Sequence, residues 1–171
     1  MKILFISSEV APFSRTGGLA DVSNSLPTSL EKLGHEVRVV TPLHGTIIER
    51  QIKLKNHKEK LLVDLCGNKY PLNIFQGSIG KQIPVMFLDH PDFFSKRQTI
   101  YGYMDDGYRF YLFCQAVIDY MLEYWQPDLI HCNDWHTGLI PNLLRTKYRK
   151  EKKFAKIPVV LTVHNLSFQG P

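Results

Sequence analysis

The first 42 residues contain the pattern that most limits the possible fold: a buried strand, a glycine-containing loop, an amphipathic helix and a second strand. Residues 3–10 form a nearly continuous apolar run, which is typical of a parallel strand covered on both faces. Apolar residues recur at helical spacing over 19–33, and Gly34 stands where that helix would end. An apolar strand over 37–41 is closed by Pro42. The segment therefore predicts a β-α-β unit.

The rest of the chain continues to alternate predicted strands and helices. The elements are expected in this order: strands at 61–66, 70–77 and 83–88 that form a hairpin and a return to the main sheet, a loop at 89–100, a helix at 104–124, a strand at 128–131, a helix at 136–148 and a strand at 157–163. This alternation predicts an α/β fold with a mainly parallel sheet. The length of 171 residues suits a single domain over 1–171.

Composition excludes several classes of protein. No apolar run approaches the roughly 20 residues that span a bilayer. The apolar N-terminal stretch is too short for a signal peptide, and Glu9 interrupts it. The three cysteines, Cys66, Cys114 and Cys132, are far apart and include no CxxC pair, which argues against a disulfide framework or a zinc site. We therefore expect a cytoplasmic protein with reduced, buried thiols.

The chain carries a formal net charge of +5, with basic residues clustered at 53–60 and 145–156. A basic balance of this kind can attract phosphates or nucleic acid. Neither cluster has interleaved aromatic residues or the pattern of a recognition helix, so we interpret both as solvated surface. A nucleic-acid-binding domain, which would bind with strong salt dependence, is therefore the weakest functional alternative.

Ligands of open α/β sheets bind beyond the carboxyl ends of the strands, and the first predicted strand end carries the sequence R-T-G-G-L-A-D at 15–21. Two glycines before a helix let the backbone approach a ligand, and the helix start offers N–H groups to an anion such as phosphate. Arg15 adds a forked cation, and Asp21 could hold the loop or bind a sugar hydroxyl. The alternative is a tight βα turn with a helix-capping aspartate. The segment is neither GxGxxG nor a P-loop, which disfavours a nicotinamide dinucleotide.

A second cluster, H-C-N-D-W-H-T-G at 131–138, follows the predicted strand at 128–131. Its carboxylate, amide and imidazole groups suit sugar hydroxyls, and Trp135 suits the apolar face of a sugar ring. A zinc site formed by His131, Asp134 and His136 would lack both the HExxH spacing and an evident further ligand. The alternative for Asp134 is to cap the helix that starts near His136.

Two further polar clusters complete the candidate site. His164 and Asn165 follow the strand at 157–163, where the alternative is a satisfied core histidine. The segment at 101–106 precedes the long helix, where the alternative is helix capping by Asp105 or Asp106. Because three clusters follow three strands, a shared site is a stronger interpretation than any one cluster supports.

Four motifs together resemble glycosyltransferase family 5, the bacterial glycogen synthases and plant starch synthases. They are S-E-V-A-P and R-T-G-G-L-A-D-V at 8–12 and 15–22, Y-M-D-D-G-Y-R-F at 103–110, P-D-L-I-H-C-N-D-W-H at 127–136, and T-V-H-N-L-S-F-Q-G at 162–170. The resemblance covers the whole chain. It implies a Rossmann-like, mainly parallel sheet with helices on both faces, forming the N-terminal lobe of a two-lobed GT-B glycosyltransferase.

The family transfers glucose from ADP-glucose, or UDP-glucose in some members, to the non-reducing end of an α-1,4-glucan. The resemblance therefore implies a retaining hexosyltransferase without a metal or other cofactor, whose partners are ADP-glucose and glycogen or a maltooligosaccharide, with no nucleic acid or membrane. It also implies that the C-terminal nucleotide-binding lobe lies outside these 171 residues, so that this part is inactive alone. The alternative is a stand-alone glucan-binding or regulatory module without catalysis.

The resemblance also assigns roles to individual residues, and it assigns no metal ligands. Catalysis falls to His164 and Asp134. Donor binding falls to Arg15, Gly17, Gly18, His164 and Asn165, and the acceptor side of the cleft falls to Asp21, Tyr103, Asp105, Trp135 and His136. The sequence departs from the family pattern at Arg15, where lysine is usual, and at Asp106, where asparagine is usual.

Overall fold

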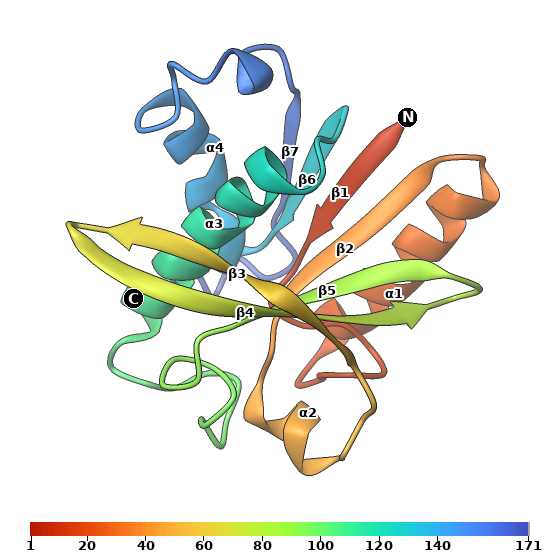
Figure 1. Cartoon of the computed structure of the whole chain (residues 1–171). Helices are drawn as coiled ribbons and strands as arrows, with labels where there is room; N and C mark the ends of the chain where they lie inside the picture. The colour runs from red at the N-terminus through yellow and green to blue at the C-terminus, as the bar shows by residue number, and fades with distance from the viewer. Residues whose placement is uncertain (171) are drawn as a thin grey trace.

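The computed structural model describes residues 1–170, which form one seven-stranded sheet in the order β3-β4-β5-β2-β1-β6-β7 (Figure 1). The strands are β1 (Lys2–Ile6), β2 (Glu36–Pro42), β3 (Lys55–Leu65), β4 (Asn68–Ile79), β5 (Ile83–Asp89), β6 (Leu129–Asn133) and β7 (Val159–Thr162). Five of them, from β5 to β7 in the sheet order, are parallel to their neighbours in this group, and β4 is antiparallel to both of its neighbours, β3 and β5. The predicted α/β fold with a mainly parallel sheet is confirmed. The predicted domain, 1–171, includes Pro171, which lies outside the described residues.

Helices cover both faces of this sheet. They are α1 (Gly18–Lys32), α2 (Gly45–Glu49), α3 (Asp106–Glu123) and α4 (Leu139–Arg145), with short 3-10 helices at Trp135–Thr137 and Lys152–Phe154. In Figure 1, α1 lies on one face and α3 and α4 on the other. No helix within residues 1–170 is long and apolar enough to cross a membrane.

Alternating side chains of β1 build the two cores between these layers. Ile3 and Phe5 belong to the core on the α1 side, whereas Leu4 and Ile6 belong to the larger core under α3 and α4. Successive side chains of a strand point to opposite faces, so a strand covered on both sides must be apolar throughout. The unbroken apolar run that opens the sequence is therefore explained by the central position of β1 in the sheet.

The winding of the chain reverses at β1, which pairs with β2 on one side and β6 on the other. From β1 the chain passes through α1 to β2, and β5 joins on that same side. After β5 it passes through α3 on the opposite face and returns to β6 beyond β1. Where strand order reverses, the loops diverge and leave a crevice beyond the carboxyl ends of the strands. By this rule, a ligand crevice is expected between the loops after β1 and β6.

Several predicted boundaries differ from the structure. The first strand ends at Ile6, because residues 7–10 leave the sheet as a buried loop. The helix predicted at 136–148 divides into a 3-10 turn and the seven-residue α4. The strand predicted at 61–66 begins at Lys55, because residues 55–60 pair with β4 while staying largely exposed and showing no apolar alternation. Helix α2 was not predicted, since five residues leave too short a pattern.

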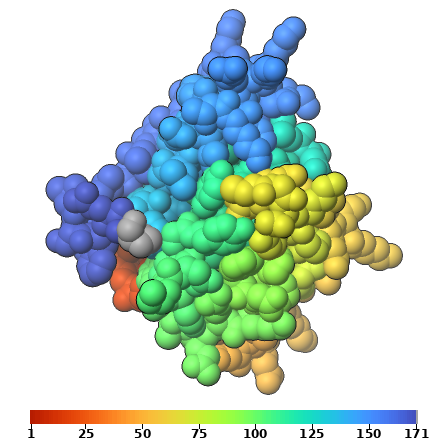
Figure 2. Space-filling view, turned by 90° about the vertical axis from the view of Figure 1, so that its left-hand side faces the viewer, coloured from red at the N-terminus to blue at the C-terminus, as the bar shows by residue number. Residues whose placement is uncertain are grey.

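The predicted exposure of the basic residues and the predicted burial of the cysteines agree with the structure in part. The lysines and arginines of 53–60 and 145–156 are exposed, and in Figure 2 the blue segment between α4 and β7 projects from one end of the molecule. Their interpretation as solvated surface fits this placement. Cys114 and Cys132 are buried free thiols as predicted, but Cys66 is exposed at the β3–β4 turn, so the prediction of buried thiols is wrong there.

A buried cation fixes the long loop that precedes α3. The guanidinium of Arg109 is fully buried, and its Nε lies 2.7 Å from Oδ1 of Asp106. Arg109 also donates to the backbone carbonyls of Phe93, at 2.9 Å, and Ile100. Asp106 in turn accepts the N–H of Gly102 at 2.8 Å. These bonds hold the residues around 93–102 against the first turn of the helix.

Replacement of Arg109 by methionine should destabilise the chain by about 3–5 kcal/mol, because it leaves the Asp106 carboxylate and two carbonyls buried without their donor. Urea unfolding followed by circular dichroism measures the change. Arg149→Met, at an exposed position, is the control and should change stability by less than about 0.5 kcal/mol. Equal stability of the two variants would contradict a structural role for the Arg109 cluster.

Two histidines are buried beside the carboxyl edge of the sheet. Nε2 of His44 lies 2.8 Å from the carbonyl oxygen of Ser8, and burial lowers the pKa of His44 to about 4. His136 packs between the rings of Tyr101 and Trp135, and burial lowers its pKa to about 3. Both imidazoles are therefore neutral at neutral pH, although both protonate near pH 6.5 in the unfolded chain.

Because both folded-state pKa values are lowered, the unfolded chain binds more protons as the pH falls through 6.5. The free energy of unfolding should therefore fall by about 2–3 kcal/mol between roughly pH 7.5 and pH 5.5, above the range in which most carboxylates titrate. Urea unfolding at a series of pH values measures it. His44→Gln should remove about half of this loss, whereas His35→Gln, at a position without such burial, should leave it intact. An unchanged slope in His44→Gln contradicts the assignment.

Candidate functional site

Hydrogen bonds join the ends of β1, β6 and β7 at the point where the strand order reverses. The Asp134 carboxylate, after β6, accepts the backbone N–H of His164, after β7, at 2.7 Å. Nε2 of His164 lies 2.9 Å from Oδ1 of Asn133, whose Nδ2 donates to the carbonyl of Ile6, at the end of β1, at 3.0 Å. Because Nδ2 faces a carbonyl, Oδ1 is the acceptor and His164 Nε2 carries the proton. The structure thus brings the first three predicted clusters to one edge.

Asp134 has a backbone conformation that suggests a special role. Its φ of 57° and ψ of −179° lie in a region that residues with a side chain rarely adopt. Such a conformation costs about 1–3 kcal/mol and is concentrated at functional sites. The side chain does not cap the following 3-10 turn, so the capping alternative is wrong. Its carboxylate is used to hold the loop after β7.

A buried carboxylate, Glu9, holds the glycine-containing loop from beneath. It accepts the N–H of Thr16 at 2.5 Å, the hydroxyl of Thr16 at 2.6 Å and the N–H of Gly17 at 3.3 Å. The hydroxyl of Tyr101 donates to the same carboxylate at 2.7 Å. Neither Glu9 nor Tyr101 was assigned a role from the sequence. The available signal was a carboxylate inside an apolar run that follows the first strand.

The outer face of this loop is open at Gly17 and Gly18. A Cβ added to either glycine would meet no atom within 4 Å, and the φ of Gly17 is −152°, which any residue adopts. Internal packing therefore requires glycine at neither position, and the face of the loop at these residues is open. The N–H of Gly17 is turned toward Glu9. Helix α1 then presents its first N–H groups from Gly18 onward.

Arg15 and Asp21 form an ion pair across the mouth of the loop. Their Nη2 and Oδ2 atoms are 2.7 Å apart, and the two side chains are 64% and 51% exposed. An ion pair with this exposure contributes about 0–1 kcal/mol. The pair therefore stabilises the loop only weakly, and separating it would cost little. Whether Asp21 holds the loop or binds a sugar hydroxyl stays a prediction.

Aromatic rings line the other side of the crevice. The ring of Tyr101 stacks on His136 with centroids 4.6 Å apart, and Trp135 packs on the other side of His136 at 4.0 Å. His136 is only 7% exposed and Trp135 is partly exposed, and both border a cavity of about 340 Å³. Gly170 lies against the Trp135 ring, where a Cβ would come within 2.9 Å of Cε3. Of the predicted aromatic contacts, Trp135 is the better placed to touch a ligand.

Tyr103 and Asp105 form a separate group before α3. Arg97 donates to both oxygens of Asp105, at 3.2 and 2.6 Å, and its guanidinium lies 4.6 Å from the centre of the Tyr103 ring. The Tyr103 hydroxyl accepts the N–H of Thr99 at 3.0 Å, which lowers the Tyr103 pKa. Neither Asp105 nor Asp106 caps α3 through its side chain, so that alternative is wrong as well. No hydrogen bond within residues 1–170 joins this group to Asp134 or His164.

The side chains of Asn165 and His131, near the ends of β7 and β6, already form hydrogen bonds within the chain. Asn165 accepts the N–H of Ser167 through Oδ1 at 3.0 Å, so its amide stabilises a turn. Burial, together with the nearby His164, lowers the pKa of His131, whose Nε2 lies 2.8 Å from the Thr162 hydroxyl oxygen. Within residues 1–170, no three His, Cys, Asp or Glu side chains are grouped closely enough to hold a metal ion. The functional roles of these residues stay predictions.

Comparisons with known proteins agree on one family. The model of the starch synthase catalytic domain matches residues 2–171. Glycogen synthase of Anoxybacillus flavithermus is 43% identical over 171 residues, covering 99% of this chain and 35% of that protein. Glycogen synthase of Moorella thermoacetica is 44% identical over 174 residues, covering 99% and 34%. The chain therefore spans about a third of the length of these relatives.

A solved structure gives the same result at the level of the fold. The catalytic domain of starch synthase IV from Arabidopsis thaliana, bound to ADP and acarbose, matches with a TM-score of 0.87 and 28% identity. The match covers 96% of this chain and 34% of that one. The predicted family and its fold are thereby confirmed: the chain belongs to the starch synthase catalytic domain family, glycosyltransferase family 5.

Proposed function

We propose that this chain forms the acceptor-side lobe of a glucosyltransferase that moves glucose from ADP-glucose to the non-reducing end of an α-1,4-glucan. The observation that carries the proposal is the cluster at the reversal of strand order, where Asp134, in a strained backbone conformation, binds the loop of His164 opposite the open glycines. The starch synthase that matches in structure has ADP and acarbose bound. Glycogen synthases are the relatives in sequence.

The geometry suggests how this lobe would serve the transfer. Departure of a nucleoside diphosphate needs cations and N–H groups aimed at the developing anion. The start of α1 and the guanidinium of Arg15 lie on the open face of the loop and can supply them. Asp134 and His164 would position the transferred glucose, and Trp135 would contact the glucan. Transfer without an obvious nucleophile depends on positioning, which the hydrogen-bonded strand ends provide.

The proposal limits what the chain does alone. By the family resemblance, most nucleotide contacts and a catalytic glutamate belong to a second lobe outside these 171 residues. We therefore expect glucan binding but no measurable glucose transfer from the chain itself. The proposal needs no metal or organic cofactor, and it includes a cytoplasmic location, with which three free cysteines agree.

A stand-alone glucan-binding module is the second candidate. The observation that favours it is the 2.7 Å ion pair that Asp21 forms with Arg15, which stands in place of the usual lysine. ADP binding to the chain distinguishes the two functions. A transferase lobe should bind ADP with millimolar affinity and more weakly after Arg15→Gln, whereas a module without catalysis should bind glucan and no ADP.

Asp134→Asn should weaken the binding of maltopentaose to the chain about fivefold or more, because it removes the carboxylate charge while keeping an acceptor for the His164 N–H. Isothermal calorimetry or NMR titration measures the dissociation constant. Asp128→Asn is the matched control, since Asp128 precedes the same strand at the opposite edge of the sheet and accepts the N–H of Lys2. If all three proteins bind alike, Asp134 has no part in acceptor binding.

Glu9→Gln should loosen the glycine-containing loop. Four donors converge on the Glu9 carboxylate, and a glutamine offers one acceptor oxygen while its NH₂ group faces donors. We expect hydrogen exchange at the N–H groups of Thr16 and Gly17 to accelerate about tenfold or more. Glu151→Gln, at an exposed site, should leave both rates unchanged. Unaltered protection in Glu9→Gln would mean that the loop keeps its shape without this carboxylate.

A further inference from the structure

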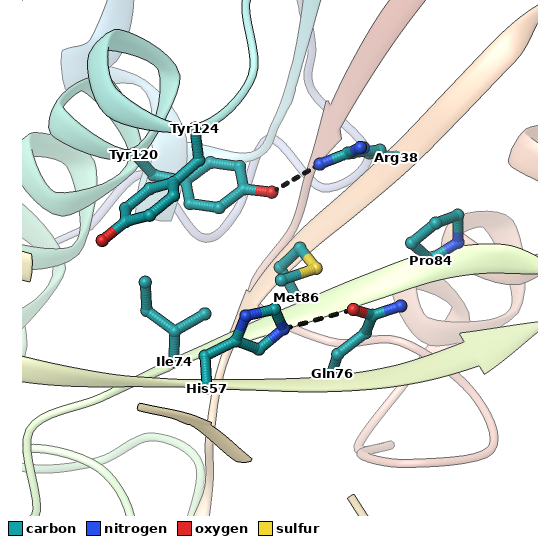
Figure 3. A pocket seen from close by; sticks show the side chains of 8 residues that line it. All are labelled: Arg38, His57, Ile74, Gln76, Pro84, Met86, Tyr120 and Tyr124. Atoms are coloured by element: carbon teal, nitrogen blue, oxygen red, sulfur yellow. Dashed lines mark hydrogen bonds between the residues drawn. The ribbon is translucent and has the colours of Figure 1, made fainter. Parts of the chain in front are cut away.

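A second cavity lies at the opposite edge of the sheet from the proposed glucan site. It encloses about 230 Å³ between the sheet and the C-terminal end of α3 (Figure 3). Arg38 is the third residue of β2 and Pro84 the second of β5, so both mark the amino ends of parallel strands. Tyr120 and Tyr124 come from the end of α3. The proposed transfer uses none of these residues.

Arg38 brings a positive charge to this cavity. Within residues 1–170 it takes part in no ion pair. Its Nη1 donates to the hydroxyl of Tyr120 at 3.0 Å, and its guanidinium lies 4.8 Å from the centre of the Trp125 ring. The nearby Glu36 accepts the Nε1–H of Trp125 at 3.2 Å. A guanidinium held by a hydroxyl and an aromatic face keeps its full charge and most of its donors for a ligand.

The opposite wall offers an imidazole and an amide over an apolar floor. Nε2 of His57 lies 3.2 Å from Oε1 of Gln76, which leaves the NH₂ group of Gln76 to donate elsewhere. Figure 3 shows Met86 between the two walls, with Arg38 and the tyrosines on one side and His57 and Gln76 on the other. Ring-shaped ligands with hydroxyl groups suit an apolar floor bounded by a few polar groups.

The two ends of the cavity differ in the charges that lie near them. Burial raises the pKa of Tyr124, and the carboxylates of Glu123 and Glu59 raise it further. Negative charge therefore lies near Tyr124, while the positive charge of Arg38 is at the other tyrosine. An anionic group would be attracted to the Arg38 end and repelled from the Tyr124 end.

We propose that this cavity binds a monosaccharide phosphate, with the phosphate at Arg38 and the sugar ring between Gln76 and Tyr124. A bidentate guanidinium contact suits a phosphate, and the amide and hydroxyl groups suit sugar hydroxyls. The volume of about 230 Å³ is below that of the usual sites for drug-sized ligands, about 300–1,000 Å³. This size favours one sugar ring over an oligosaccharide or a nucleotide.

NMR titration of the chain with glucose 6-phosphate, inorganic phosphate and glucose, each alone, tests the proposal. We expect glucose 6-phosphate to bind saturably, with amide shifts at 36–40, 74–76, 85–86 and 120–125. Inorganic phosphate should bind about tenfold more weakly, because it keeps the group for Arg38 but lacks the sugar ring. Glucose should not bind measurably, because it lacks the phosphate. Saturable binding of glucose as tight as that of its phosphate would overturn the proposal, as would equal affinity for inorganic phosphate.

Variants assign the binding to the cavity. Arg38→Gln should weaken glucose 6-phosphate about tenfold or more, and Gln76→Met, which leaves the cation in place, about threefold. Arg149→Gln, in the exposed basic segment, is the control and should leave affinity unchanged. If both Arg38→Gln and Gln76→Met bind like the unaltered chain, the proposal fails. Asp134→Asn should not change the binding of glucose 6-phosphate, so the proposals for the glucan site and for the phosphate site are tested independently.

Discussion

The carboxylate of Glu9 is the group on which the geometry of the proposed site most depends. Four donors converge on it, from the backbone of Thr16 and Gly17 and from the hydroxyls of Thr16 and Tyr101. Bonds to a charged acceptor are the stronger kind, and a buried carboxylate is stable only when it is well supplied with donors. One buried anion therefore sets the position of the glycine-containing loop.

The same carboxylate also links the two sides of the crevice. Tyr101, which donates to Glu9, stacks on His136, and His136 packs against Trp135. The glycine-containing loop follows β1, Tyr101 follows β5, and His136 and Trp135 follow β6, so these contacts cross the point where the strand order reverses. The loop and the aromatic rings are thereby held at a fixed separation, which the proposed transfer would require because it relies on positioning.

At the carboxyl ends of the strands, firmly bonded residues lie beside residues that are held only weakly. Asp134 keeps its unusual backbone because its carboxylate binds the His164 N–H at 2.7 Å and its own N–H binds the Thr162 carbonyl at 2.9 Å. By contrast, Arg15 and Asp21 are held only by an exposed ion pair. The firm contacts thus lie beneath the loop and the weak contacts lie where a ligand would enter. The amino edge shows a similar arrangement, since Arg38 is fixed by Tyr120 and Trp125 while its charge stays unpaired within residues 1–170.

The sequence by itself determined the α/β class, the central buried strand and the residues that gather at the carboxyl edge. These follow from local rules: an apolar run marks a strand covered on both faces, and polar clusters after such strands share one edge. The motifs also identified the family that the comparisons show. Capping of the 3-10 turn by Asp134 and of α3 by Asp105 or Asp106 was a reasonable prediction from spacing. It failed because the Asp134 carboxylate binds a backbone N–H after β7, while Asp105 and Asp106 form ion pairs with arginines.

Only the tertiary structure decided what each polar group does. Glu9 and Tyr101 are 92 residues apart in sequence, so no local pattern could reveal their hydrogen bond. The exposed part of β3 carries no apolar alternation, and its pairing with β4 comes from the hairpin. The cavity at Arg38 needs side chains from five elements, β2, β3, β4, β5 and α3, and therefore has no sequence signature. Local periodicity encodes elements, whereas the partners of buried charges are fixed only when distant segments pack together.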